Sequence, residues 1–390
     1  MKAGVVRLFV VAALAIAALL ALTAPASAIE RNFAGSAQLD YHFVPTNRQA
    51  KAFPSGFDGF TMEFAGKLAV DFSEKVSANM KVCYGCHGFE ADMMYFDFRI
   101  ADELNFRVGR FSPSFGAFNL RHDPANHRLS DKPLPYDMGR MLRMRQWNQG
   151  VLPSPFPDNG IEVNGTKWLG SSVQLDYAAY AVMGFKADTR PLDIDFKLNR
   201  SPQNYYVDQN ARPTVGGRVA LTFKLGESSD LTWGGSSMYG TYDPENKENY
   251  FIFGSDLTLR LDKTNIRAEY LARRTTFSIA DKSIFKYVVP DTQGDFFMKH
   301  GGYVEVEQAL TPELDLVGRV DGLLRVGNVE AQSELSRKSS VFRYTIGTAY
   351  AIERGLRVKF STELWEFSDR DSLTGNKLEL SMHAALAGSF

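Results

Sequence analysis

The two cysteines of the chain occupy positions 83 and 86, in a Cys-Tyr-Gly-Cys-His run that ends at residue 87. The C-x-x-C-H pattern is the attachment signature of c-type haem. In that chemistry each thiol adds to one vinyl group of the macrocycle, and the adjacent histidine binds the iron. We therefore expect Cys83 and Cys86 to hold one covalent haem through thioether bonds, with His87 as the proximal iron ligand.

Two other interpretations of these cysteines stay open. A disulfide between Cys83 and Cys86 would close the tip of a β-hairpin, and free or metal-binding thiols are the third reading. A redox pair of the thioredoxin type needs a βαβ context, and a zinc site needs two more ligands nearby. Neither of these is visible around the motif, so the choice lies mainly between haem and disulfide.

The sixth position on such a haem iron needs a second ligand. His127 and His122 rank first, because they follow a strand close to the motif, and His42 ranks behind them. Histidine and methionine axial ligands set different reduction potentials. Three methionines of the same stretch are further candidates: Met138, Met141 and Met144.

The segments that carry these residues alternate apolar and polar side chains with a period of two. At the C-terminus, Leu380 and Met382 fall on one face, whereas Glu379, Ser381 and His383 fall on the other. Such alternation is typical of a strand with one apolar face. The runs are longer than the usual strand of about 5–6 residues, and they suit the tilted strands of about 9–11 residues that cross a bilayer.

We predict about 16 strands, separated by links that are alternately short and long. The strands are 35–44, 60–73, 77–86, 89–101, 103–112, 159–166, 170–182, 212–226, 229–241, 248–262, 264–277, 297–309, 312–325, 339–353, 355–368 and 375–390. The long links are 45–59, 113–158, 183–211, 278–296 and 326–338. Short turns at one end and long loops at the other indicate an outer-membrane barrel with an even number of strands. The expected fold of residues 29–390 is therefore one all-β, antiparallel transmembrane barrel in the outer membrane of a Gram-negative bacterium.

Composition excludes several other classes of protein. Hydrophobic residues make up 44%, charged residues 23% and aromatic residues 13%, which excludes wholesale disorder. The net charge of −1 argues against a nucleic-acid partner, and a mean hydropathy of −0.22 excludes a bundle of transmembrane helices. No nucleophile–base pair, phosphate-binding loop or paired carboxylates stand out, which argues against a hydrolase or a group-transfer enzyme.

Both ends of the chain carry export features. Residues 1–28 combine Lys2 and Arg7 with an apolar run and a small-residue site at 26–28, which predicts a cleaved signal peptide. The last strand alternates and ends at Phe390, which resembles the signal read by the outer-membrane barrel assembly machinery. That resemblance implies the assembly machinery as a partner, with outer-membrane lipid around the finished barrel.

The faces opposite the apolar ones are expected to line the interior. They carry interleaved acids and bases, and a barrel of about 16 strands is wide enough for an aqueous channel. The alternative is that charges and loops fill the interior and leave only a membrane anchor. The predicted pore-lining residues are Arg218, Lys224, Arg267, Glu269, Arg273, Glu305, Glu307, Asp315, Arg319, Asp321, Arg357, Lys359 and Glu363.

The longest link, 113–158, is expected to fold into the lumen. It begins within residues 109–116, Gly-Arg-Phe-Ser-Pro-Ser-Phe-Gly, which resemble the Gly-Arg-Phe-x-Pro-Pro-Phe-Gly stretch of phosphate-selective (O/P-type) porins and depart from it at Ser114. The resemblance implies a porin with this loop as its constriction. Three arginines make the loop locally basic, which would favour anions: Arg140, Arg143 and Arg145.

Topology places the cysteine motif at the outer rim, at the tip of the hairpin between the third and fourth strands. Lys81 and Cys83 are expected to face the lumen, whereas Glu90 and Asp92 share the lipid-side alternation close to the tip. A barrel with one such motif resembles the fused monohaem cytochrome–porins of extracellular iron oxidation. Those proteins carry the motif before the barrel, whereas here it follows two strands.

The function expected first is electron transfer at or across the outer membrane through one haem c near the outer mouth. A single haem cannot bridge a hydrocarbon core of about 30 Å, so this reading requires periplasmic or extracellular cytochromes as partners. One alternative is a passive porin, with a disulfide between its cysteines, for small solutes that include anions. The other is a structural barrel that holds partner cytochromes. A homotrimer is the expected assembly.

Overall fold

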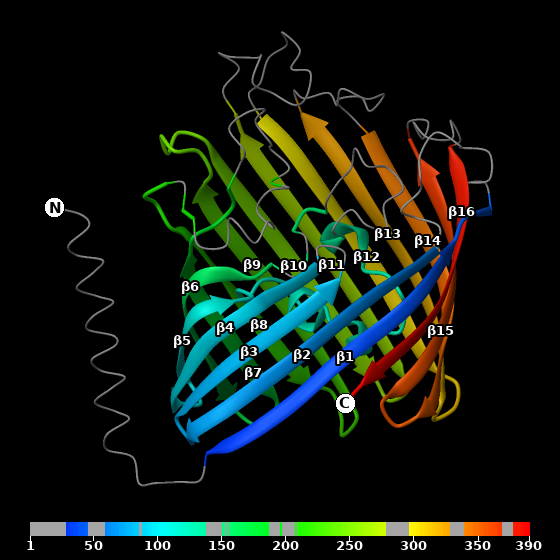
Figure 1. The fold of residues 1–390 in the computed structure, drawn as a ribbon, viewed down its shortest axis with the longest axis horizontal. Helices are drawn as coiled ribbons and strands as arrows, with labels where there is room; N and C mark the ends of the chain where they lie inside the picture. The colour runs from blue at the N-terminus through cyan, green and yellow to red at the C-terminus, as the bar shows by residue number, and fades with distance from the viewer. Residues whose placement is uncertain are drawn as a thin grey trace, which may run out of the picture.

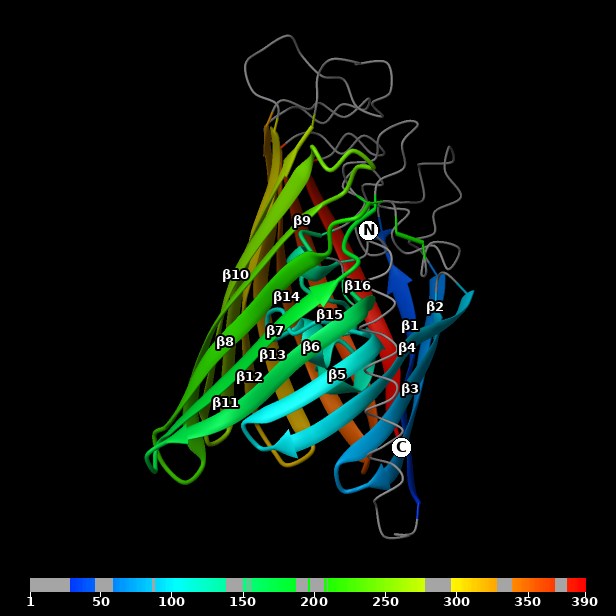
Figure 2. The same cartoon turned by 90° about the vertical axis from the view of Figure 1, so that its left-hand side faces the viewer.

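The described residues form a closed barrel of sixteen antiparallel strands, in which each strand pairs with its neighbours in sequence and β1 pairs with β16 (Figure 1). The computed structural model describes residues 29–45, 59–85, 88–137, 150–152, 154, 156–186, 196, 207–208, 210–277, 296–327, 339–368 and 377–390. Figure 2 shows that the strands slope steeply around the barrel. The predicted fold class is confirmed.

The strands have the following bounds: β1 Glu30–Phe43, β2 Gly59–Ser73, β3 Val76–Gly85, β4 Gly88–Ala101, β5 Leu104–Phe111, β6 Asp158–Leu169, β7 Val173–Val182, β8 Thr214–Lys224, β9 Ser229–Thr241, β10 Asn249–Leu261, β11 Thr264–Thr276, β12 Phe296–Ala309, β13 Leu314–Gly327, β14 Ser339–Glu353, β15 Leu356–Phe367 and β16 Leu378–Ser389. Three 3₁₀ turns lie between β5 and β6: η2 Asn119–Arg121, η3 Pro124–Asn126 and η4 Leu134–Tyr136. The number and order of the strands agree with those predicted from the sequence. The largest difference in a strand boundary is at β1, which begins at Glu30 rather than at the predicted residue 35.

Alternation along each strand sorts the side chains into an apolar exterior and a polar interior. On β1, Phe33 and Leu39 are exposed, whereas Gln38, Asp40 and His42 are buried. The same division recurs around the barrel, so that large apolar side chains cover the outside. An exterior of this kind suits a hydrocarbon environment, and the closed sheet satisfies its backbone groups without water. Among the described residues, no helix is long and apolar enough to cross a bilayer.

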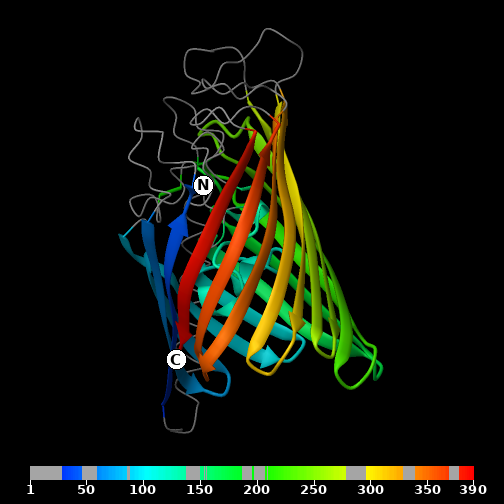
Figure 3. The ribbon, with the colours of Figure 1, turned by 90° about the vertical axis from the view of Figure 1, so that its right-hand side faces the viewer.

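The seam of the barrel joins the first strand to the last, as Figure 3 shows for the neighbouring β1 and β16. The amide of Gly35 donates to the carbonyl of Phe390 at 2.8 Å, and the amide of Phe390 donates to the carbonyl of Gly35 at 3.1 Å. The Phe390 ring then packs against Phe33, with ring centroids 5.6 Å apart. A Cβ atom on Gly35 would lie 2.3 Å from that ring, so the Phe390 ring fits here only because residue 35 has no side chain.

A bulge in β4 corrects one of the expected side-chain orientations. Lys81 pairs with Met93 and Val82 with Ala91, so that Asp92 is the extra residue. The bulge turns Asp92 inward, where it is buried, and places Glu90 opposite Cys83. The expectation that both acids follow the lipid-side alternation was therefore wrong, because one inserted residue reverses the faces beyond it.

We predict that Gly35→Val impairs closure of the barrel. The added side chain would collide with the Phe390 ring, and such overpacking costs about 1–3 kcal/mol. Refolding into detergent, followed by the shift in gel mobility between folded and heated samples, measures the effect. Gly235→Val is the matched control, because nothing lies within 4 Å of a Cβ at that strand position. Equal folded fractions for the two variants would contradict a role for this contact.

Candidate functional site

The link between β5 and β6 runs inside the barrel, and we call its described residues 112–137, 150–152, 154 and 156–157 the inward segment (Figure 1). Two glycines of the 109–116 stretch lie at the point where β5 leads into this segment. Gly109 has a φ of +131°, and its Cβ would lie 2.4 Å from the Met94 carbonyl oxygen. Gly116 has a φ of +63°, and its Cβ would lie 2.0 Å from the Tyr136 hydroxyl. The stretch thus has a structural role: it turns the chain from the wall into the lumen.

An ion-pair network holds the inward segment to the wall at β13 and β14. Asp131 pairs with Arg319 at 2.8 Å and also with Arg343. Arg343 in turn pairs with Asp321 and, at 3.4 Å, with Glu363. All five side chains are almost completely buried. Removing one partner from such a network typically costs about 3–5 kcal/mol, because a buried charge is left uncompensated.

A second anchor lies on β11. Glu269 accepts hydrogen bonds from the Tyr136 hydroxyl at 2.5 Å and from the Phe118 amide at 2.6 Å. Burial and the neighbouring Glu269 carboxylate raise the pKa of Tyr136 well above its ordinary value, so the phenol stays protonated and donates. Phe115 and Phe118 are buried beside it. The inward segment therefore has an apolar core of its own.

A third anchor lies near the seam. The Lys359 ammonium donates to the Gln38 side chain at 2.9 Å, to the Pro124 carbonyl at 2.8 Å and to the Leu129 carbonyl at 3.2 Å. Gln38 also donates to the Ser130 carbonyl at 2.8 Å. Two strands that are distant in sequence, β1 and β15, thus hold the same part of the inward segment.

Two cavities lie between the inward segment and the wall formed by β1–β8. One, of about 370 Å³, is lined by residues of β1–β5 that include Lys67 and Lys81. The other, of about 320 Å³, is lined by residues of β5–β8 that include Asp176 and Arg218. Arg107 lines both cavities, so they adjoin along this side of the lumen. Both are lined by charged groups of either sign.

The predicted pore-lining residues divide into two groups by their burial. Eight are buried beneath the inward segment or against the wall: Glu269, Arg273, Glu305, Glu307, Arg319, Asp321, Lys359 and Glu363. Four are partly exposed: Arg218, Arg267, Asp315 and Arg357. Lys224 is exposed at the end of β8, with its ammonium 4.5 Å from the centre of the Trp168 ring. Most of these charges therefore serve as anchors or as paired lining groups.

Three of the partly exposed lining residues pair with charged side chains. Arg218 pairs with Asp256 at 2.5 Å, Arg267 with Glu307 at 2.6 Å, and Asp315 with Arg128 of the inward segment at 2.5 Å. Sequence reasoning did not single out Arg107, Asp131, Glu162 or Arg343. Arg107, Glu162 and Arg343 lie on strands, where the two-residue alternation predicts that they face inward. Asp131 lies in a loop, where no local pattern predicts its position.

Cys83 lies beside a buried polar cluster. Its Sγ atom is 3.6 Å from a carboxylate oxygen of Asp92, and Asp92 pairs with Lys81 at 3.0 Å. Lys81 also contacts Asp123 at 2.8 Å and donates to Nε2 of His122 at 2.6 Å. Among the described residues, Cys83 has no disulfide partner. Its motif partners Cys86 and His87 lie outside the described residues.

The three candidate sixth ligands occupy different places. His122 lies next to the strand of Cys83 through its contact with Lys81, and its Nδ1 donates to the Asn119 carbonyl at 2.7 Å. His127 donates to the Leu129 carbonyl at 2.9 Å. Cys83 pairs with Ala65 and Ala65 with Ser36, so His42 lies six residues further along β1, about 20 Å along the strand. The structure therefore places His42 far from Cys83 and next to His383.

Several other predicted features fall outside the described residues. They are the signal peptide 1–28, the basic loop positions Arg140, Arg143 and Arg145, and the methionines Met138, Met141 and Met144.

We predict that acid loosens the inward segment through His122. Burial and the Lys81 charge lower the pKa of His122 to about 4 in the anchored segment, from about 6.5 in water. Because the released imidazole binds a proton first, anchoring weakens as the pH falls below about 6.5, by up to 1.4 kcal/mol per unit until about pH 4.

Single-channel conductance between pH 7 and pH 4.5 measures this effect. We expect conductance and current noise to rise on acidification in the unmodified barrel and to change less in His122→Gln. His300→Gln is the control, because His300 lies on β12, half-exposed beside Tyr270. The same pH slope in His122→Gln and in the unmodified barrel would argue against His122 as the sensing group.

Solved structures with a similar fold are outer-membrane proteins. An anion-selective porin from Comamonas acidovorans matches at a TM-score of 0.56 with 11% identity, over 93% of this chain and 100% of its own. The outer membrane channel DcaP of Acinetobacter baumannii matches at 0.55 with 10% identity, over 93% and 97%. OmpT of Vibrio cholerae matches at 0.51 with 8% identity, over 94% and 99%.

No protein-family model and no curated protein sequence matches the chain. At these identities the structural matches establish the fold, and the apolar exterior agrees with it. The chain has the closed sixteen-stranded barrel fold of these outer-membrane proteins, which agrees with the location that the sequence predicts.

Proposed function

We propose that this barrel is a passive diffusion channel for small hydrophilic solutes, with the inward segment as its constriction. The observation that carries the proposal is the fixed position of that segment. Buried ion pairs hold it at β13 and β14, whereas cavities remain between it and β1–β8. A segment that served only to fill the barrel would have no need to leave charged cavities along one side.

The lining of these cavities favours weak selectivity for charge. Arg107 pairs with Asp97 at 2.9 Å and with Glu162 at 3.3 Å. Glu162 also accepts a hydrogen bond from the Ser114 amide at 2.8 Å. Because acids and bases are paired at short distance, their fields largely cancel for a passing ion. We therefore propose solutes of either charge, rather than the strong preference for anions that the basic loop positions would give.

Covalent haem remains a second candidate, and one observation favours it. The inward segment places His122 against Lys81, two residues from Cys83 on the same face of β3. Cys83 and Cys86 would hold the macrocycle, His87 would bind the iron from one side, and His122 is the best-placed second ligand. When bound, such a haem supplies one-electron transfer. Electron exchange would then need cytochrome partners at the mouth of the barrel, and a scaffold for those cytochromes is the related alternative.

Two further expectations remain predictions. The alternating terminal strand that ends at Phe390 is proposed to be read by the barrel assembly machinery. A homotrimer is proposed because barrels of this size are often trimers, with outer-membrane lipid around the remaining exterior.

We predict that Asp131→Ala widens the channel. The substitution removes the carboxylate shared by Arg319 and Arg343, which loosens the inward segment at its most buried anchor. Single-channel conductance in planar bilayers, together with swelling rates of liposomes in sugars of increasing size, should both increase. Asp230→Ala is the control, because it breaks an exposed ion pair with Arg260. That pair joins the start of β9 to the end of β10, away from the inward segment. A barrel that conducts no ions before or after the change would exclude the channel.

The haem candidate predicts a covalent adduct in protein from a host that matures c-type cytochromes. A pyridine haemochrome spectrum and a haem-stained denaturing gel should be positive for the unmodified chain and negative for a Cys83→Ser, Cys86→Ser double variant. His122→Gln should keep the covalent haem but change its visible spectrum. Protein without haem, in which both cysteines are oxidised to a disulfide, rules this candidate out.

A further inference from the structure

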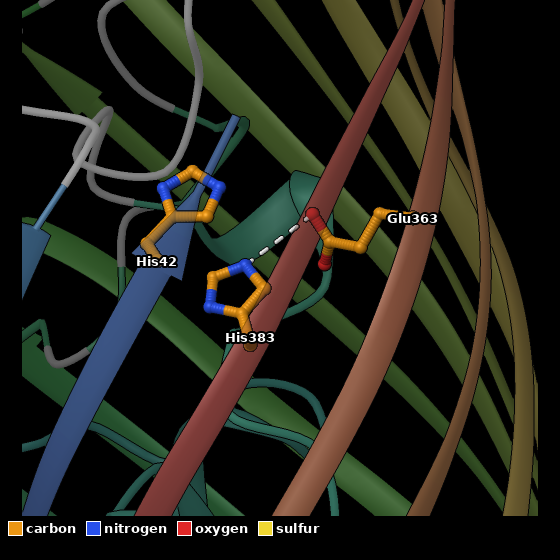
Figure 4. A group of neighbouring side chains, drawn as sticks. All are labelled: His42, Glu363 and His383. Atoms are coloured by element: carbon orange, nitrogen blue, oxygen red, sulfur yellow. Dashed lines mark ion pairs between the residues drawn. The ribbon is translucent and has the colours of Figure 1, made fainter. Parts of the chain in front are cut away.

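A second group of ligating side chains lies at the seam of the barrel, away from the cysteine motif. His42 of β1, His383 of β16 and Glu363 of β15 point toward one another inside the wall (Figure 4). One ligand atom from each lies within 4.8 Å of the others. The three side chains are 4%, 3% and 0% exposed. Two imidazoles and a carboxylate thus converge among buried side chains.

The orientation of His383 is fixed by a carboxylate behind it. Nδ1 of His383 donates to Asp40 at 2.8 Å, so the other ring nitrogen, Nε2, is the one that faces Glu363. That Nε2 is 3.5 Å from Glu363, is buried, and has no hydrogen-bond partner among the described residues. A histidine that donates its other ring nitrogen to a carboxylate is the usual arrangement around protein-bound zinc, because it fixes the tautomer and raises ligand basicity.

Glu363 is also held in position. Its carboxylate accepts hydrogen bonds from the Ser381 hydroxyl at 2.8 Å and from the Trp365 indole at 3.1 Å, and it pairs with Arg343 at 3.4 Å. These contacts restrict its motion. A restrained carboxylate and a restrained imidazole lose little conformational freedom when they bind an ion, which favours binding.

The donor set selects the class of ion. Calcium and magnesium take oxygen ligands almost entirely, whereas two imidazoles with one carboxylate suit zinc and related first-row metals. The rings of His42 and His383 stack, with centroids 4.2 Å apart and an angle of 8° between them. Because the two rings are parallel, their ring-nitrogen lone pairs do not point at one position. For both imidazoles to bind the same ion, the His42 ring must turn about its Cβ–Cγ bond. The other two ligands need little movement.

We propose that His42, Glu363 and His383 form a binding site for one zinc-class divalent ion, with Asp40 as the residue that orients His383. The site joins the first strand to the last two, so the bound ion fastens the seam of the barrel. Because the ligands come from β1, β15 and β16, the unfolded chain does not hold the ion in this way. Binding therefore favours the closed state in proportion to the concentration of free ion.

Titration of Zn²⁺ into the untagged, detergent-folded barrel tests the proposal. We expect one Zn²⁺ per chain by elemental analysis after dialysis, no competition from excess Mg²⁺ or Ca²⁺, and a higher temperature for the loss of the heat-modifiable band. His383→Gln should abolish both effects. Asp40→Asn keeps the three ligands and should weaken the affinity about 10–100-fold. His300→Gln, which changes a histidine of β12 outside the cluster, should bind as the unmodified barrel does.

The gel-mobility shift shows which variants have folded, and only folded protein is compared. If His383→Gln does not fold, Asp40→Asn and the stoichiometry of the unmodified chain decide the matter. Less than about one Zn²⁺ per ten chains overturns the proposal. Equal affinity in Asp40→Asn and the unmodified barrel, or full displacement by Mg²⁺, does so as well.

Discussion

Closure of the hydrogen-bonded sheet is the constraint on which the rest of this structure depends. In hydrocarbon an unpaired backbone group costs several kcal/mol, so the first strand must pair with the last along its whole buried length. Residues 36–43 of β1 pair with β16, and Gly35 exchanges two hydrogen bonds with Phe390. Once the cylinder is closed, the two-residue alternation fixes the direction of each side chain, either toward lipid or toward the lumen.

The lumen imposes a second demand, because its charges lie among protein atoms rather than in bulk water. Desolvation of an isolated charge is expensive, and only close partners offset it. The inward segment supplies those partners: Asp131 to Arg319, and backbone carbonyls to Lys359 and Arg343. It therefore supplies partners to wall charges on β13, β14 and β15 and, through Asp123, to Lys81 of β3.

The sequence made the wall predictable and left the interior largely unpredictable. Periodicity and loop length are local properties, and they were sufficient for the number of strands, their order and their faces. Asp92 escaped them, because a one-residue bulge carries no compositional mark. The pairing of Asp131 with Arg319 joins residues 188 positions apart. Such a pair depends on the path of the inward segment and on the register of the strands from β5 to β13, which no local pattern encodes.

The same contrast separates the two places in this chain where ligand chemistry is concentrated. Cysteines 83 and 86 are recognisable in the sequence because their spacing alone defines the motif. His42 and His383 are 341 positions apart, and they meet only because β1 and β16 pair at that register. A histidine on the inner face of a strand is unremarkable until closure brings a second one beside it. The seam therefore creates a donor set that exists only in the folded barrel.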